Sequence, residues 1–198
     1  DDHFAIYLLD VCGHGVGSAL MSVSAINTLR SQSLKNVDFL KPSSVLHALN
    51  NIYLMENHHG KFFTLWYGVY SKSERKLKFA SAGHPAALLV STDSTSKSEL
   101  IALQTPNIAM GCFEDFEFAE DEIALKRFAK LYLYSDGVFE VEKSNGDMMC
   151  FSEFNDLMHQ YTDPSEMQSA FVLKNIEMIN ANNTVFEDDF SLLEIIFN

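Results

Sequence analysis

The sequence predicts an α+β fold in which antiparallel sheets form the core and helices flank them. The order of its segments is the main reason: two helical patterns, a run of strand-like segments, two more helical patterns and a final strand. In a parallel βαβ fold strands and helices alternate, and here they do not. The chain has 198 residues and 47% of them are hydrophobic. This is enough to bury the core of one such domain.

The beginning of the chain predicts a strand, a turn and two helices. The apolar run over 4–11 is typical of a buried strand, and the glycine-rich segment 13–17 predicts a turn after it. Helical spacing over 18–35 predicts the first helix, and Pro42 marks the start of the second. The residues expected on the buried faces are Leu20, Val23, Ile26 and Leu29 in the first helix and Val45, Leu46, Leu49, Ile52 and Tyr53 in the second.

The middle of the chain is dominated by predicted strands. Apolar runs predict strands over 62–70, 76–81 and 87–90, and the short connections between them are typical of an antiparallel meander. The Ser- and Thr-rich segment 91–98 is expected to form a polar loop. The remaining predicted elements are strands over 101–103, 116–118 and 128–134, helices over 152–160 and 165–179, and a strand over 190–197.

Composition and charge exclude several classes of function. The formal net charge is −13, and the few Lys and Arg residues are scattered, which argues against nucleic-acid binding. No apolar run approaches the roughly 20 residues that cross a bilayer, so no membrane contact is expected of this segment. The three Cys residues are far apart, and neither a zinc ribbon nor a disulfide framework is indicated. Reduced thiols in a cytoplasmic protein are the simplest interpretation.

Three short acidic motifs flank predicted strands and suggest a metal site. They are Asp10-Val11-Cys12-Gly13-His14-Gly15, Ser135-Asp136-Gly137 and Glu187-Asp188-Asp189. Each motif lies where a strand ends or begins, and a side chain can be aimed from such a rigid position. Carboxylates that come close together repel each other unless a cation neutralises them. Their hard oxygen atoms suit Mg²⁺ or Mn²⁺, and a site of this type usually handles phosphate.

Two other interpretations of the first motif stay open at this point. Asp10 alone is also consistent with a turn residue that caps the following helix. The glycines of segment 13–17, between a strand and a helix, invite a dinucleotide-binding interpretation with Asp38 as the acidic residue roughly 20 positions on. The spacing of these glycines departs from that fingerprint, and no second parallel strand is predicted after the helix.

Five segments resemble, in the same order, the signatures of one family of enzymes. This family is the SpoIIE/RsbU-like branch of the metal-dependent (type 2C, PPM) Ser/Thr protein phosphatases, and the resemblance spans nearly the whole chain. The segments are Leu9-Asp10-Val11-Cys12-Gly13-His14-Gly15-Val16-Gly17-Ser18-Ala19-Leu20, Phe63-Thr64-Leu65-Trp66-Tyr67-Gly68-Val69-Tyr70, Ser81-Ala82-Gly83-His84-Pro85, Tyr134-Ser135-Asp136-Gly137-Val138-Phe139-Glu140 and Glu187-Asp188-Asp189-Phe190-Ser191-Leu192-Leu193.

The resemblance implies a four-layer α-β-β-α sandwich with a centre for two Mn²⁺ or Mg²⁺ ions. In that centre Asp10 would bridge the two ions, and the carbonyl of Val11 would bind one of them. Asp136 and Asp188 would hold the other ion, whereas Asp189 falls at the flanking position. The family carries an earlier Gly-Gly-Asp-type motif, whose position would fall before the first residue of this sequence.

The resemblance also implies a proton donor, a substrate and a larger protein. The eukaryotic branch has a histidine near its first aspartate that is proposed as the general acid, and His14, offset from that position, is the candidate here. Residues 1–198 would form the C-terminal phosphatase domain, without its N-terminal edge, of a signalling protein with an upstream receiver or sensor domain. The substrate would be a phosphorylated anti-anti-sigma protein of the STAS type. A homodimer is compatible with this reading, and a catalytically inactive module that binds a partner protein is the alternative function.

Overall fold

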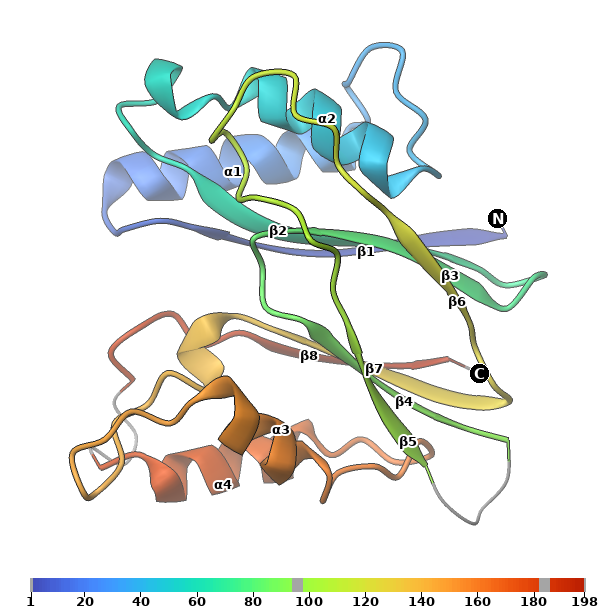
Figure 1. Cartoon of the computed structure of the whole chain (residues 1–198), viewed down its shortest axis with the longest axis vertical. Helices are drawn as coiled ribbons and strands as arrows, with labels where there is room; N and C mark the ends of the chain where they lie inside the picture. Colours follow the sequence, from blue (N-terminus) through green and yellow to red (C-terminus); the bar gives the residue numbers. More distant parts are fainter. Residues whose placement is uncertain (1, 94–97, 182–185, 198) are drawn as a thin grey trace. The chain divides into compact units, whose positions relative to one another are not determined.

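The computed structural model describes residues 2–93, 98–181 and 186–197, and these form two compact units. Unit 1 comprises Asp1–Pro85 and Gln104–Ala124, and unit 2 comprises Ala86–Leu103 and Leu125–Asn198. In each unit, helices cover one face of an antiparallel sheet (Figure 1). The predicted α+β class, with antiparallel sheets flanked by helices, is therefore confirmed.

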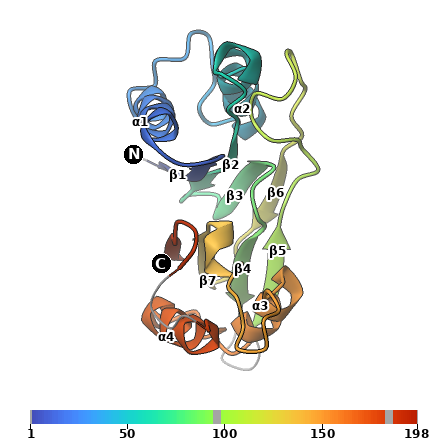
Figure 2. The same ribbon diagram turned by 90° about the vertical axis from the view of Figure 1, so that its left-hand side faces the viewer.

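The unit 1 sheet positions the first acidic motif. Its strands are β1 (His3–Val11), β2 (Phe63–Ser71), β3 (Lys76–Ala82) and β6 (Asp121–Ala124). They lie in the order β1-β2-β3-β6 (Figure 2), and each neighbouring pair is antiparallel. Because β1 pairs with β2 along its full length, Asp10 lies opposite Thr64 and Val11 lies opposite Phe63.

The helices of unit 1 are α1 (Val16–Arg30) and α2 (Pro42–Ile52), followed by the short 3₁₀ helix η1 (Met55–Asn57). The prediction for α2 is largely confirmed, since Pro42 lies in its first turn and Val45, Leu46 and Leu49 are buried, although Ile52 is exposed. Both helices lie on the same face of the unit 1 sheet (Figure 1).

The buried face predicted for α1 is only partly confirmed, since Leu29 is buried, and its predicted end at residue 35 is wrong. Leu20 and Val23 are exposed, and the helix ends at Arg30. The residues that it buries are Ser18, Met21, Ala25 and Leu29. The buried face therefore runs through positions 18, 21, 25 and 29, and Leu20 and Val23 lie on the other side of the helix.

The strand predicted over 116–118 is also wrong. Phe116 and Phe118 lie in a loop, where their rings pack edge to face with centroids 4.9 Å apart. Phe118 belongs to the unit 1 core, and His47 of α2 is hydrogen-bonded through Nδ1 to the carbonyl of Phe116 at 3.0 Å. The apolar character of this segment reflects a loop packed against α2.

The predicted meander holds for its first two strands only. β2 and β3 form an antiparallel hairpin, but the next strand, β4 (Ala87–Thr92), belongs to the unit 2 sheet. Gly83, with φ at +65°, begins a turn with His84 and Pro85 at the boundary of the two units. Proline has no N–H for a strand ladder, so the pairing ends here.

Gly111 is a position in unit 1 where we expect a measurable loss of stability on substitution. Its φ is +89°, and an added Cβ would lie 2.3 Å from the carbonyl oxygen of Tyr53. The Gly111 N–H also donates to the buried Asn50 Oδ1 at 2.8 Å. Gly111→Ala should therefore lower the free energy of unfolding by about 1–3 kcal/mol in urea denaturation. Gly146→Ala is the matched control, because Gly146 has φ at +85° and nothing within 4 Å of the added Cβ. An equal loss in both variants would contradict the proposed clash.

The unit 2 sheet brings the other two acidic motifs side by side. Its strands are β4, β5 (Glu99–Leu103), β7 (Phe128–Tyr134) and β8 (Leu192–Phe197). They lie in the order β5-β4-β7-β8 and are antiparallel. Tyr134, the last residue of β7, lies opposite Leu192, the first residue of β8. The segment that follows β7 is therefore adjacent to the segment that precedes β8.

The polar loop predicted over 91–98 is shorter than expected. Ser91 and Thr92 are the last residues of β4, where Ser91 pairs with Glu99 of β5. Residues 94–97 of that prediction lie outside the described part of the chain.

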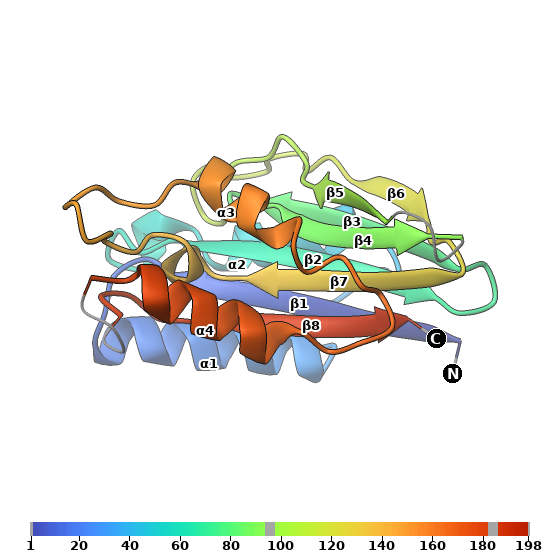
Figure 3. The ribbon, with the colours of Figure 1, turned by 90° about the horizontal axis from the view of Figure 1, so that it is seen from below.

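The helices of unit 2 are α3 (Phe151–Met158) and α4 (Ser169–Ile179), and both cover the same face of its sheet (Figure 1). α4 lies alongside β8 (Figure 3). The apolar core under these helices includes Tyr132, Tyr134, Phe154, Met158, Val172 and Ile176. The predicted helix over 152–160 is confirmed to within two residues at each end, whereas α4 begins at Ser169 and not at residue 165.

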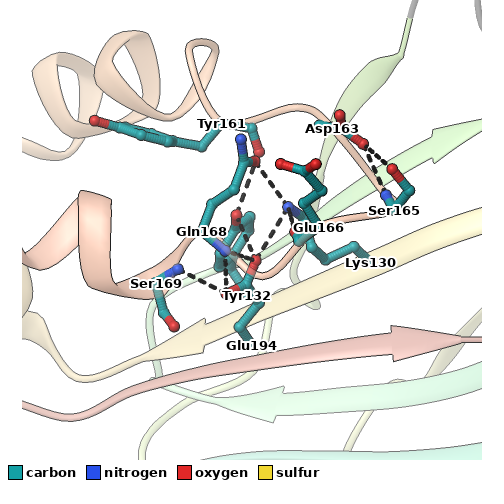
Figure 4. A network of polar contacts seen from close by, with 9 residues as sticks. All are labelled: Lys130, Tyr132, Tyr161, Asp163, Ser165, Glu166, Gln168, Ser169 and Glu194. Carbon is teal, nitrogen blue, oxygen red and sulfur yellow. Dashed lines mark hydrogen bonds and ion pairs between the residues drawn. The ribbon is translucent and has the colours of Figure 1, made fainter.

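A fully buried ion pair lies between β7 and β8 on the face that the helices cover (Figure 4). Lys130 Nζ is 3.0 Å from Glu194 Oε1, and neither side chain is exposed to solvent. Nζ also donates to the carbonyl of Glu166 at 3.0 Å and to Gln168 Oε1 at 2.9 Å. Tyr132 Oη donates to Glu194 Oε1 at 2.9 Å. The pair therefore joins the sheet to the segment that leads into α4.

Glu194 also fixes where α4 begins. The Ser169 N–H donates to Glu194 Oε2 at 2.7 Å, and the Gln168 N–H donates to both carboxylate oxygens at 2.7 and 2.8 Å. A carboxylate at a helix N-terminus satisfies N–H groups that have no partner within the helix. The cap comes from β8, so it was not visible in the local sequence around residue 165.

None of the helices in the described part of the chain has an apolar stretch that would reach across a membrane.

Candidate metal centre

Asp10 is the second-last residue of β1 in the unit 1 sheet. It is half-buried and is followed by Val11, the last residue of the strand. Just beyond the strand, the Cys12 N–H donates to the carbonyl of Phe62 at 3.0 Å, so the paired backbone extends past Asp10. The N-cap of α1 is Gly15. Asp10 is therefore not the N-cap of α1.

The turn after Asp10 is tied to the start of β2. Ser18 Oγ donates to the carbonyl of Cys12 at 3.4 Å, and Lys61 Nζ donates to Ser18 Oγ at 2.9 Å. His14 is exposed in this turn, where we expected a proton donor. The turn therefore places His14 close in sequence to Asp10 and Val11, and the Lys61 side chain reaches the start of α1 from the segment before β2.

Asp136 and Asp188 come from neighbouring segments of unit 2. Asp136 begins the 3₁₀ turn η2 (Asp136–Val138), separated from the end of β7 by one residue, and its Oδ1 accepts the Gly137 N–H at 3.0 Å. Asp188 lies in the loop before β8, and its Oδ1 accepts the Asp189 N–H at 2.8 Å. A Cβ added at Gly137 would lie 2.7 Å from the carbonyl oxygen of Asp189 and 3.3 Å from the carbonyl carbon of Asp188. The backbones of the two motifs are thus in direct contact.

The two aspartates also act electrostatically on a third acid, Glu140. Burial, together with the negative charges of Asp136 and Asp188, raises the pKa of the Glu140 carboxyl above its ordinary value. Like charges that crowd together have this effect, and a bound cation would relieve it. The unit 2 acids therefore form a local site of negative potential.

The donor set fits a hard divalent cation, and the structure brings part of it together. Asp136 and Asp188 supply carboxylate oxygens of the kind that Mg²⁺ and Mn²⁺ prefer. Asp10 and Val11 belong to unit 1, so the complete predicted set stays a prediction. Within the described residues no group of three or more His, Cys, Asp or Glu side chains gathers closely enough to hold a metal ion.

His84 has structural surroundings, and the three cysteines are not paired with one another. His84 is buried, and its Nδ1 is hydrogen-bonded to Thr64 Oγ1 at 2.9 Å, which supports a role in holding its turn. Cys12, Cys112 and Cys150 are free thiols, as predicted.

Sequence reasoning assigned no role to Ser135 or Glu140, although both lie in the second motif. Ser135 is buried and bonded to the loop that carries Asp188. Glu140 stands four residues after Asp136, a spacing that brings side chains close when the chain turns helically. The short turn η2 begins at Asp136, and the Glu140 N–H donates to the Asp136 carbonyl at 2.8 Å.

Comparison with protein families gives a match over the whole chain. The family model described as Stage II sporulation protein E (SpoIIE) matches residues 1–198. The match therefore includes all three acidic motifs and both units.

Two curated relatives come from Bacillus subtilis (strain 168). "Phosphoserine phosphatase RsbP" is 29% identical over 142 residues, which is 71% of this chain and 34% of the relative. "Phosphoserine phosphatase RsbU" is 25% identical over 193 residues, which is 95% of this chain and 54% of the relative. The chain thus spans about a third of RsbP and about half of RsbU.

Solved structures show the same fold. The SiaA-PP2C domain of Pseudomonas aeruginosa superposes with a TM-score of 0.78 at 19% identity, covering 100% of this chain and 81% of that one. RsbX, solved in complex with magnesium, superposes with a TM-score of 0.58 at 14% identity, covering 99% of this chain and 81% of that one. At these identities the likeness is one of fold.

Proposed function

The chain belongs to the SpoIIE family of type 2C phosphatases, and from this premise we propose that it hydrolyses phosphoserine and phosphothreonine esters on a protein, with Mn²⁺ or Mg²⁺ as cofactor. The observation that carries the proposal is the direct backbone contact between the Asp136 and Asp188 motifs at one end of the unit 2 sheet. The names of RsbP and RsbU as phosphoserine phosphatases support the reaction class.

In the proposed mechanism the acids of the chain hold the cofactor. Asp10 and the carbonyl of Val11 would supply ligands from unit 1, and Asp136 and Asp188 would supply them from unit 2. When bound, the two ions would lower the pKa of a water molecule and neutralise charge on the phosphoryl group. The water oxygen would bond to phosphorus as the bond from phosphorus to the serine or threonine oxygen breaks, with no covalent bond to the chain. His14, exposed in the turn after Asp10, is the residue that we assign to protonate the leaving oxygen.

The substrate that we propose is a phosphorylated regulatory protein of the STAS anti-anti-sigma type, in bacterial two-component or stress signalling. The net charge of −13 would repel a phosphoprotein, so recognition depends on the cations at the site. The relatives RsbP and RsbU are longer than this chain. We propose that residues 1–198 act as the output domain behind a receiver or sensor domain. We place this activity in the cytoplasm, where the three free thiols would stay reduced.

The experiment that tests the function is hydrolysis of p-nitrophenyl phosphate as Mn²⁺ is titrated. We expect activity that requires Mn²⁺ and that falls more than about a hundredfold in Asp10→Asn. Removing a residue that only orients a metal ligand already lowers metal affinity or activity by about 10–100-fold, and losing a ligand should cost more. Asp121→Asn is the matched control, since it removes the same charge from an exposed strand residue of the same unit. Full activity in Asp10→Asn would contradict the proposed role of Asp10.

The same protein should then release phosphate from a phosphoserine-containing STAS protein. Calorimetry with Mn²⁺ separates the proposal from the alternative of a catalytically inactive module. A folded protein with neither Mn²⁺ binding nor hydrolysis would favour that alternative.

A further inference from the structure

Ser135 connects the two acidic motifs of unit 2 through both its backbone and its side chain. It lies between β7 and Asp136 and is only 3% exposed. The Ser135 N–H donates to the carbonyl of Ser191 at 3.0 Å. In return, the Ser191 N–H donates to Ser135 Oγ at 3.0 Å, and Oγ donates to the carbonyl of Asp189 at 2.7 Å. The buried hydroxyl of Ser135 thus donates one hydrogen bond to this loop and accepts another from it.

The bond between the Ser135 hydroxyl and the Asp189 carbonyl lies one residue away from both proposed ligands. Ser135 directly precedes Asp136, and the carbonyl that its hydroxyl contacts belongs to Asp189, the residue after Asp188. Gly137, on the other side of Asp136, leaves only enough room for a hydrogen atom beside the Asp189 carbonyl. The loop before β8 is therefore fixed against the turn after β7 on both sides of Asp136.

The remaining bonds of these segments do not replace the Ser135 hydroxyl. The carboxylate oxygens of Asp136 and Asp188 each accept the N–H of the next residue, which fixes each side chain to its own segment. The Ser135 N–H bonds to Ser191, three residues beyond Asp188, whereas the Ser135 hydroxyl also bonds to Asp189, the neighbour of Asp188. Without this hydroxyl, the Ser191 N–H and the Asp189 carbonyl lose their partner, and the loop gains freedom to move away from Asp136.

We propose that Ser135 is a positioning residue that holds the segments of Asp136 and Asp188 together, so that both carboxylates can serve one divalent cation. The inference rests on the proposed metal-dependent function and adds a residue to it. Groups that orient metal ligands in this way typically change metal affinity by about 10–100-fold when they are removed. Ser135 itself is not a metal ligand in this arrangement, because its Oγ is already hydrogen-bonded to Ser191 and Asp189.

The test is the dissociation constant of Mn²⁺, measured by calorimetry on the substrate-free protein together with the thermal midpoint. Ser135→Ala should weaken Mn²⁺ binding by about 10–100-fold. Ser135→Thr, which keeps the hydroxyl, should restore most of the affinity. Ser135→Cys provides a second variant of similar size with a much weaker hydrogen-bond donor, should the alanine variant fold poorly. It too should bind Mn²⁺ more weakly than the wild type.

Ser81→Ala is the matched control for a purely structural role. Ser81 is equally buried, accepts the Thr105 N–H at 3.0 Å and donates to the Thr105 carbonyl at 3.3 Å, but it lies in unit 1 and outside the acidic motifs. It should lower the thermal midpoint without changing Mn²⁺ affinity. Wild-type affinity in a folded Ser135→Ala or Ser135→Cys protein would overturn the positioning role alone. Absence of Mn²⁺ binding in the wild type would overturn the proposed metal centre itself.

Discussion

Replacing Asp136 with asparagine is expected to abolish Mn²⁺ binding and Mn²⁺-dependent hydrolysis while the protein stays folded. Asparagine has the same shape as aspartate, and its Oδ1 can still accept the Gly137 N–H that Asp136 accepts at 3.0 Å. What it loses is the negative charge that a hard cation requires. We expect the Mn²⁺ affinity and the rate of hydrolysis each to fall by more than about a hundredfold. This exceeds the loss that is typical when a residue that only orients a metal ligand is removed.

A second measurement on the same variant is independent of metal and activity. The charge of Asp136 is one of the causes that raise the pKa of Glu140. In the metal-free Asp136→Asn protein the pKa of Glu140 should therefore fall toward its ordinary value, as measured by NMR titration. Glu177→Gln on α4 serves as the charge control, because it removes one negative charge elsewhere in unit 2. An unchanged Glu140 titration would mean that Asp136 does not face this group of acids.

The strand order of the unit 2 sheet explains why two of the motifs could be predicted to meet. Both Asp136 and Asp188 flank apolar strands in the sequence, and β7 and β8 are neighbours whose adjoining ends carry these residues. An apolar run of period two is a local signal that survives folding. The pairing of two strands far apart in the sequence was supplied by the resemblance to the phosphatase family, since periodicity alone does not determine which strands become neighbours.

The predictions that failed depended on packing between distant segments. Phe116 and Phe118 have the apolar character of a strand, yet α2 buries them as part of a loop. The start of α4 was placed four residues too early because its cap, Glu194, comes from β8. In α1 the buried face contains Ser18, Met21, Ala25 and Leu29, whereas Leu20 and Val23 are exposed. In each case a tertiary contact overrode a local pattern.

The polar groups that hold the candidate site were the least visible in the sequence. Ser135 belongs to a motif whose functional residue is the aspartate that follows it. Its neighbours in the sequence do not predict its hydrogen bonds to residues 189 and 191. Lys130 lies in a segment chosen for its apolar residues, where a buried cation is unexpected without a partner. The partner, Glu194, is 64 positions away (194 − 130) and becomes adjacent only when β7 and β8 pair.

Replacing Lys130 with methionine is expected to cause the largest loss of stability, about 3–5 kcal/mol in the free energy of unfolding. Methionine fills the space of the lysine stem but leaves the Glu194 carboxylate buried without its cation. The Glu166 carbonyl and Gln168 Oε1 also lose the donor that they share. Urea denaturation should show a lower midpoint with an unchanged slope.

The same substitution at a surface ion pair is the control. Lys126 Nζ lies 2.7 Å from Glu99 Oε2, a shorter distance than in the buried pair, but this pair is exposed to solvent. Lys126→Met should therefore cost at most about 1 kcal/mol. Equal losses in the two variants would show that burial of Lys130 and Glu194 does not determine their contribution.

A double variant separates the ion pair from the helix cap. Glu194→Gln alone leaves the Lys130 ammonium buried without its counter-charge and weakens the cap on Gln168 and Ser169. In Lys130→Met/Glu194→Gln neither charge remains, so the loss should be clearly smaller than the sum of the two single losses. Additive losses would indicate that the two side chains act independently.

The ion pair of Lys130 and Glu194 should also affect how stability depends on pH. Burial alone would raise the pKa of Glu194, but the N–H groups of Gln168 and Ser169 and the Lys130 ammonium hold it below its ordinary value of 4.5. Because the folded-state pKa is the lower one, the stability that Glu194 contributes is present above pH 4.5 and is lost as the pH falls through the folded-state pKa. In Lys130→Met the carboxylate loses its cation, so its folded-state pKa should rise and acid unfolding should begin at a higher pH. An acid-unfolding curve that coincides with that of the wild type would show that Lys130 does not stabilise the ionised form of Glu194.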